Sequence, residues 1–127
     1  KYRVLVGAKD LPLIPSQVGM ATTKAIKEQP QRLRAIQAAR RDGTRFIYEN
    51  TEEAIRILAK VYEPMPANDV AIMVKDLVAA KFWSEGRIDM TMLQNAVRAM
   101  KAVDMLEKDV DLKSIVDSSF LPADLQK

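Results

Sequence analysis

Phe82-Trp83-Ser84-Glu85-Gly86-Arg87-Ile88-Asp89 is the stretch that decides how this chain is organised. It is a turn between two helical patterns, with Gly86 inside the turn and Asp89 directly before the second pattern. A carboxylate in that position can accept hydrogen bonds from the first backbone N–H groups of a helix. The stretch therefore predicts two helices joined by a turn. Apolar residues follow Asp89 at helical spacing, at Leu93, Ala96, Val97, Met100 and Val103.

Two more helices are predicted at the start of the helical region. Thr22 or Thr23 can cap a short helix that runs through Gln29, and Pro30 suits the first position of the next one. Gly43 in this second helix predicts either close packing against another element or a break into two shorter helices. The apolar positions at helical spacing are Leu33, Ile36, Ala39, Gly43, Phe46 and Ile47.

Asn50-Thr51-Glu52-Glu53 predicts the start of a further helix, because Asn50 and Glu53 are spaced for a capping box. This helix is expected to end near Tyr62. Asn68 or Asp69 then caps a helix through Lys81, and Asp111 starts a final short helical turn. The predicted buried positions of the two longer helices are Ala54, Ile55, Leu58, Val61 and Tyr62, followed by Val70, Met73, Val74 and Leu77.

The beginning of the chain has β-type patterns instead. Tyr2 to Val6 reads as a short strand, Lys9 to Pro15 as an extended loop, and Gln17 to Ala21 as a second short strand. The expected fold is therefore mostly α, with one or two short N-terminal strands followed by five or six helices.

The composition excludes several classes of protein. The chain has 127 residues, about one domain, and it contains no Cys and no His. Thiol nucleophiles, imidazole bases and the usual zinc ligands are therefore missing. The formal net charge is only +3. No apolar run approaches the roughly 20 residues that span a bilayer, and no signal peptide is present in this sequence.

Clusters of charged residues have ordinary explanations. Arg40-Arg41, with Arg32, Arg34 and Arg45 nearby, is interpreted as a solvated helix face and not as a nucleic-acid interface. The paired carboxylates lie at predicted helix ends, and the four glycines form no phosphate loop. We therefore expect no catalytic residue, no metal site and no cofactor, and we predict that the chain is not an enzyme.

Four polar residues are the candidate ligand contacts: Lys9, Asp10, Ser16 and Gln17. They flank the proline-containing loop between the two predicted strands, and loops that follow strands often carry binding residues. An ordinary surface loop is the alternative. Trp83 could stack on a ligand, but a lone Trp after an apolar helix more often seals the edge of a core.

The order of segments resembles a known family. The relevant stretches are Ala21-Thr22-Thr23-Lys24-Ala25-Ile26-Lys27-Glu28-Gln29-Pro30, Leu33 to Gly43, Asn50 to Ala54, the Phe82-Trp83 turn and Asp117-Ser118-Ser119-Phe120-Leu121-Pro122. Together they are similar to the C-terminal part of substrate-binding proteins of the nitrate/sulfonate/taurine ABC-importer family. That family also includes binding proteins for thiamine-pyrimidine precursors. Thr51 stands where the family frequently has proline.

The resemblance implies a fragment of an α/β fold, the two-lobed type 2 periplasmic-binding fold. Residues 1–21 would be hinge-proximal strands and loop, and residues 22–127 the closing helices of this C-terminal segment. The implied function is to bind a small anionic or heteroaromatic solute and deliver it to a membrane permease. The implied location is periplasmic or lipid-anchored and extracytoplasmic.

Two other expectations stand beside this one. The alternative function is a small helical protein–protein interaction module without a small-molecule ligand, in which methionines contribute to a partner surface. A chain that lacks the rest of its sheets would also expose large apolar side chains. We therefore expect it to self-associate or to exchange elements between protomers.

Overall fold

The computed structural model describes Arg3, Leu5 and residues 10–126. The chain divides into two compact units. Unit 1 comprises Lys1–Thr22 and Ile88–Ser118, and unit 2 comprises Thr23–Arg87 and Ser119–Lys127. Unit 2 is therefore discontinuous in sequence, because the chain leaves it after Arg87 and returns to it at Ser119.

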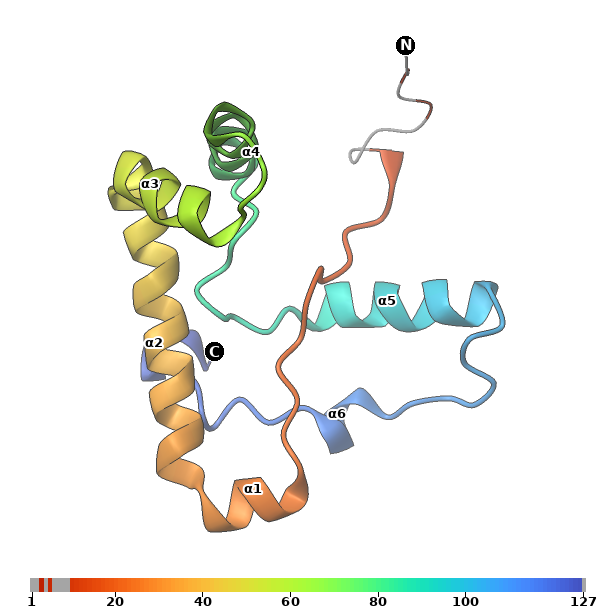
Figure 1. Ribbon diagram of the computed structural model, residues 1–127. Helices are drawn as coiled ribbons and strands as arrows, with labels where there is room; N and C mark the ends of the chain where they lie inside the picture. Colours follow the sequence, from red (N-terminus) through yellow and green to blue (C-terminus); the bar gives the residue numbers. More distant parts are fainter. Residues whose placement is uncertain (1–2, 4, 6–9, 127) are drawn as a thin grey trace. The chain divides into compact units, whose positions relative to one another are not determined.

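The described residues are mostly helical, as the sequence predicts, and their six α-helices match the expected number (Figure 1). A short 3-10 helix, η2, follows near the C-terminus. The helices are α1 (Thr23–Glu28), α2 (Pro30–Glu49), α3 (Thr51–Val61), α4 (Ala67–Ala79), α5 (Met90–Ala102) and α6 (Leu112–Ile115), and η2 spans Ala123–Leu125.

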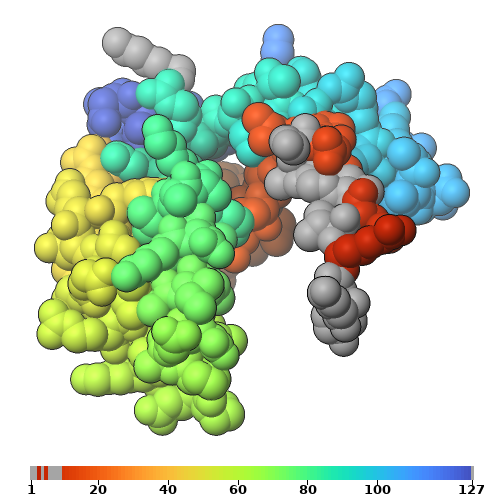
Figure 2. Space-filling view, turned by 90° about the horizontal axis from the view of Figure 1, so that it is seen from above, coloured from red at the N-terminus to blue at the C-terminus, as the bar shows by residue number. Residues whose placement is uncertain are grey.

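The core of unit 2 lies between α3 and α4, which lie side by side in Figure 2. Val70 and Val74 of α4 are completely buried (0% exposed) and pack with Ile55 of α3. Each such side chain contributes about 1.5–3 kcal/mol on burial. Trp83 packs against this cluster, which confirms its predicted role at the edge of the core. The prediction of buried positions in the second half of α3 is wrong at Val61 and at the following Tyr62, because both side chains are exposed.

The predicted apolar face of α2 is covered only in part, at Leu33 and Ile47, which are half-buried. Ile36 and Phe46 are exposed, whereas Thr44 is buried. Gly43 neither breaks the helix nor packs closely, since a Cβ placed there would meet no atom within 4 Å. Polar side chains of α2 reach other segments of unit 2 instead, and these contacts determine which face is covered.

The predicted helix caps at Asp89 and Asp111 are confirmed, whereas the predicted cap at Asn50 is wrong. Asp89 accepts hydrogen bonds from the N–H groups of Thr91 and Met92 at the start of α5, and Asp111 accepts one from Lys113 at α6. The Asn50 side chain makes no capping hydrogen bond. Its backbone N–H bonds to the carbonyl of Phe46, so the residue serves mainly to end α2.

The start of α4 also differs from its prediction. The helix begins at Ala67 with Pro66 as its N-cap, before the predicted caps Asn68 and Asp69. The fixed φ of Pro66 places the chain directly at a helix start, so no side-chain cap is required.

The predicted second strand is wrong for the described chain. Residues 17–21 are irregular, and no β-strand occurs among residues 10–126. A strand requires a neighbouring strand that satisfies its backbone groups, and the described residues provide none. The segment before residues 17–21 has a contact of another kind within unit 1. The Asn95 amide of α5 donates a hydrogen bond to the carbonyl of Leu13 at 2.8 Å. The first predicted strand, Tyr2 to Val6, lies largely outside the described residues.

Gly86 is the position at which the turn between α4 and α5 requires glycine. Its φ is +109°, and a Cβ there would lie 3.2 Å from an Nη1 atom of Arg40. We therefore expect Gly86→Ala to lower the free energy of unfolding by about 1–3 kcal/mol. Gly43→Ala is the matched control, because that helical position is open, and it should stabilise by about 0.5–1 kcal/mol. Urea unfolding of both variants checks this; equal effects would contradict it.

Candidate functional site

One face of α2 gathers the segments of unit 2 that lie far apart in sequence. Tyr48 makes the first contact. Its hydroxyl donates a hydrogen bond to the carbonyl of Trp83 at 2.8 Å and accepts one from the N–H of the same residue at 3.0 Å. The two rings meet edge to face, with centroids 6.3 Å apart. Both backbone groups of Trp83 are thereby satisfied where the chain leaves α4.

Thr44 and Arg45 of α2 bind the two residues that follow Trp83. The Thr44 hydroxyl donates to the carbonyl of Ser84 at 3.3 Å. The Arg45 guanidinium donates two hydrogen bonds to the Glu85 carboxylate, at 3.1 and 2.9 Å, in the bidentate geometry typical of this pair. This hydrogen bonding and the charge of Glu85 raise the pKa of Arg45 above its ordinary value.

The last residues of the chain lie on the same helix. We call residues 119–126 the C-terminal strap; Figure 1 shows this end of the chain beside α2. Arg34 donates to the carbonyl of Ser119 and places its guanidinium 5.2 Å from the ring centroid of Phe120. Arg41 forms an ion pair with Asp124 at 2.9 Å. Leu121 and Leu125 are only 6% and 8% exposed.

Arg32, Arg34, Arg40 and Arg45 are exposed, as the interpretation of a solvated helix face predicts, but three arginines of the group also bind other segments of unit 2. Arg34, Arg41 and Arg45 recur at spacings of seven and four residues, which places them on one side of α2. The sequence contained a signal for these contacts, namely the spacing of the three arginines and the presence of two possible acidic partners, Glu85 and Asp124, far away along the chain. The arrangement holds a fold together, and it brings no nucleophile beside a base.

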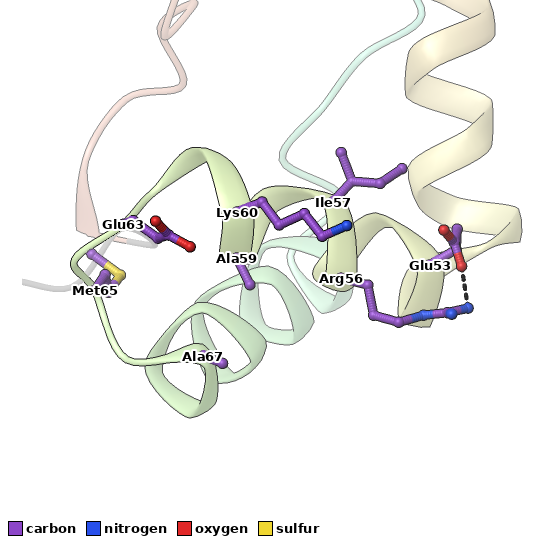
Figure 3. A pocket seen from close by; sticks show the side chains of 8 residues that line it. All are labelled: Glu53, Arg56, Ile57, Ala59, Lys60, Glu63, Met65 and Ala67. Atoms are coloured by element: carbon purple, nitrogen blue, oxygen red, sulfur yellow. Dashed lines mark ion pairs between the residues drawn. The ribbon is translucent and has the colours of Figure 1, made fainter.

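A groove lies along α3 and the turn that joins it to α4 (Figure 3). Its volume is about 520 Å³, within the range of small-molecule sites. Glu53 and Arg56 form an ion pair at one end, while Glu63 lies at the other end. Ile57 and Met65 supply apolar surface and are exposed. The groove is thus open and mixed in charge, which suits contact with a surface better than enclosure of a solute.

A smaller groove in unit 1 lies between α5 and α6, with a volume of about 280 Å³. Its lining includes Val97, Arg98 and Leu112. Arg98 already donates to the neighbouring Asn95 side chain. Elsewhere in this unit, a hydrogen bond from Lys101 and the charge of that lysine lower the pKa of Asp109. The Lys101–Asp109 ion pair ties α5 to the chain that follows it.

The predicted ligand contacts are not gathered into either groove. Asp10, Ser16 and Gln17 are exposed on the irregular segment of unit 1, and Lys9 lies outside the described residues. No group of three or more acidic residues among the described ones is arranged to hold a metal ion. No described helix is long and apolar enough to cross a bilayer.

No family model matches this chain, and no curated protein or solved structure shows significant similarity to it.

The Tyr48 hydroxyl provides a direct test of how α2 is attached to the α3–α4 core. Tyr48→Phe leaves the N–H and carbonyl of Trp83 without this partner, and we expect the free energy of unfolding to fall by about 1–3 kcal/mol. Tyr62→Phe is the control, since Tyr62 is exposed, and it should change stability by less than about 0.5 kcal/mol. Denaturant unfolding followed by Trp83 fluorescence measures both. Similar stabilities for the two variants would show that the Tyr48 hydrogen bonds contribute nothing.

Proposed function

We propose that this chain is the C-terminal part of a solute-binding protein of the nitrate/sulfonate/taurine ABC-importer family. In this proposal it belongs to a two-lobed type 2 periplasmic-binding fold and works outside the cytoplasm, either in the periplasm or on a lipid anchor. Its partners are a small solute and a membrane permease. The proposal rests first on the order of sequence segments that resembles the family.

One structural observation supports it most. Residues 11–20 expose five large apolar side chains, among them Val18 at 57% and Met20 at 91%. Apolar surface of this kind is normally covered in a folded protein. The sheets of an α/β lobe would cover the predicted loop through Pro15 and the predicted strand that follows it with residues from other parts of the lobe.

The candidate ligand contacts fit the same proposal. Ser16 and Gln17 lie within the apolar segment, and Asp10 lies at its beginning. In open α/β sheets, ligands bind outside the carboxyl ends of strands. If Tyr2 to Val6 and Gln17 to Ala21 form strands in the complete lobe, then Lys9, Asp10 and Ser16 lie on the loop that follows the first strand, and Gln17 begins the second. They remain predicted contacts for an anionic or heteroaromatic solute.

A second candidate function has an observation of its own. The open groove beside α3 and the exposed Ile57, Val61 and Ile72 would suit a helical protein–protein interaction module. Such a module needs no small-molecule ligand. The two candidates therefore differ in whether any solute stabilises the protein.

Solute binding is tested on the protein encoded by the complete natural reading frame. Nitrate, sulfonates, aromatic acids and pyrimidines are screened by thermal shift, and one class should raise the Tm. A ligand at 100 times its Kd stabilises by about 2.7 kcal/mol. Ser16→Ala with Gln17→Ala should reduce the shift, whereas Gln31→Ala on α2 should preserve it. No shift with any class, or a reading frame that starts near Lys1, would reject the proposal in favour of the interaction module.

Self-association of the isolated chain is a separate consequence. The apolar residues 11–20 would remain open to water without the rest of the lobe, and patches of this kind promote association. We expect light scattering after size exclusion to give a mass above that of a monomer. Val18→Asp with Met20→Asp should return it to the monomer, and Lys24→Asp with Lys27→Asp on α1 is the control pair. A monomer at all micromolar concentrations would contradict this expectation.

A further inference from the structure

The C-terminal strap is attached to α2 by side chains that form a complementary set. On the helix, Arg34 and Arg41 supply positive charge. On the strap, Asp124 supplies a carboxylate, the Ser119 carbonyl an acceptor and Phe120 an aromatic face. Leu121 and Leu125 add the buried apolar contacts. These contacts together resemble those of a short peptide docked on a protein surface.

The connection of the strap to the rest of unit 2 is unusual. The strap follows residues 88–118, which belong to unit 1, so no residue of unit 2 precedes it directly in the chain. Its position on α2 therefore depends on the side-chain contacts themselves and on a tether that is folded into another unit. The Ile55, Val70 and Val74 cluster between α3 and α4 includes no residue of the strap, so release of the strap leaves the contacts of that cluster in place.

We propose that copies of this chain exchange their C-terminal straps, so that the strap of one copy occupies α2 of the other. The occupant is assigned by complementarity, because every copy carries the sequence that matches Arg34 and Arg41. Exchange recreates each contact in the partner, and this is why swapping of an identical element costs little. This inference does not depend on the proposed function.

The concentration at which exchange occurs is set by the tether. A tethered segment meets its own site at an effective concentration of about 1 mM. Exchange by the natural sequence therefore becomes appreciable only near that concentration, and a test must weaken the attachment within one copy. The Arg41–Asp124 pair allows this, because reversing one of its two charges makes the contact within a copy repulsive. The unchanged residue can still pair with the reversed residue of a second copy that carries the other substitution.

The test uses Arg41→Glu and Asp124→Arg in chains that also carry Val18→Asp and Met20→Asp, which remove association through residues 11–20. Either variant alone has like charges facing within each copy and between identical copies. In an equimolar mixture, each exchanged strap meets an opposite charge. We expect the mixture to form a heterodimer on the order of tenfold tighter than either homodimer, measured by light scattering. The double variant Arg41→Glu/Asp124→Arg restores the pair within one copy and should be a monomer.

Two outcomes would overturn the proposal. One is a mixture that stays monomeric up to about 1 mM, the effective concentration of the tether, while the double variant is folded. The other is an equal dimer mass in the mixture and in the single variants, since such association would ignore the charge pair. If one single variant fails to fold, the other is tested with a labelled peptide of residues 118–127. The Asp124→Arg chain receives the natural peptide, and the Arg41→Glu chain receives the peptide with Arg at position 124. Tighter binding of this peptide than of the peptide with the opposite charge at position 124 supports exchange; equal binding of the two, or binding of neither, overturns it.

Discussion

The two hydrogen bonds between the Tyr48 hydroxyl and the backbone of Trp83 are the contact on which the rest of unit 2 depends. Trp83 packs against the Ile55, Val70 and Val74 cluster, so these bonds connect α2 to the core between α3 and α4. They also place Ser84 and Glu85 beside Thr44 and Arg45. The turn at Gly86 can then pass close to Arg40 and Leu121. Without this attachment, α2 would be joined to the segment after α4 only by the contacts of Thr44 and Arg45 in the same turn.

Polar residues therefore have an unusual share in the architecture of unit 2. The α3–α4 core is small and apolar, whereas α2 is attached through hydroxyl and guanidinium groups that reach across to loops. Exposed ion pairs are individually worth little, about 0–1 kcal/mol each. Arg34 and Arg41 lie beside Leu121 and Leu125, and the burial of these leucines supplies most of the free energy that holds the strap. The charges decide where the strap lies, and the leucines contribute most of its attachment.

The sequence predicts secondary structure best where the signal is local. Asp89 and Asp111 cap their helices because the first N–H groups of a helix lack partners within it, and a carboxylate one residue before the helix is within reach of them. Asn50 fails as a cap although its spacing to Glu53 is correct, since its backbone completes α2 and Glu53 pairs with Arg56. Residues 17–21 alternate like a strand, but a strand also needs a partner, which no local pattern can supply. For the candidate site, Asp10, Ser16 and Gln17 were selected by their place in a loop, and their surroundings depend on how that loop is covered.

By itself, the sequence determined the helical character of the chain, the positions of its turns and the burial of residues such as Val70 and Val74. These properties follow from apolar spacing, prolines and caps, which act within a few residues. Only the tertiary structure decided which face of α2 is covered. Ile36 and Phe46 are exposed although they are apolar, whereas Thr44 is buried and Arg41 is half-buried. The reason is that the partners of the polar side chains, Ser84, Glu85 and the strap, come from distant parts of the chain and satisfy those polar groups only after folding.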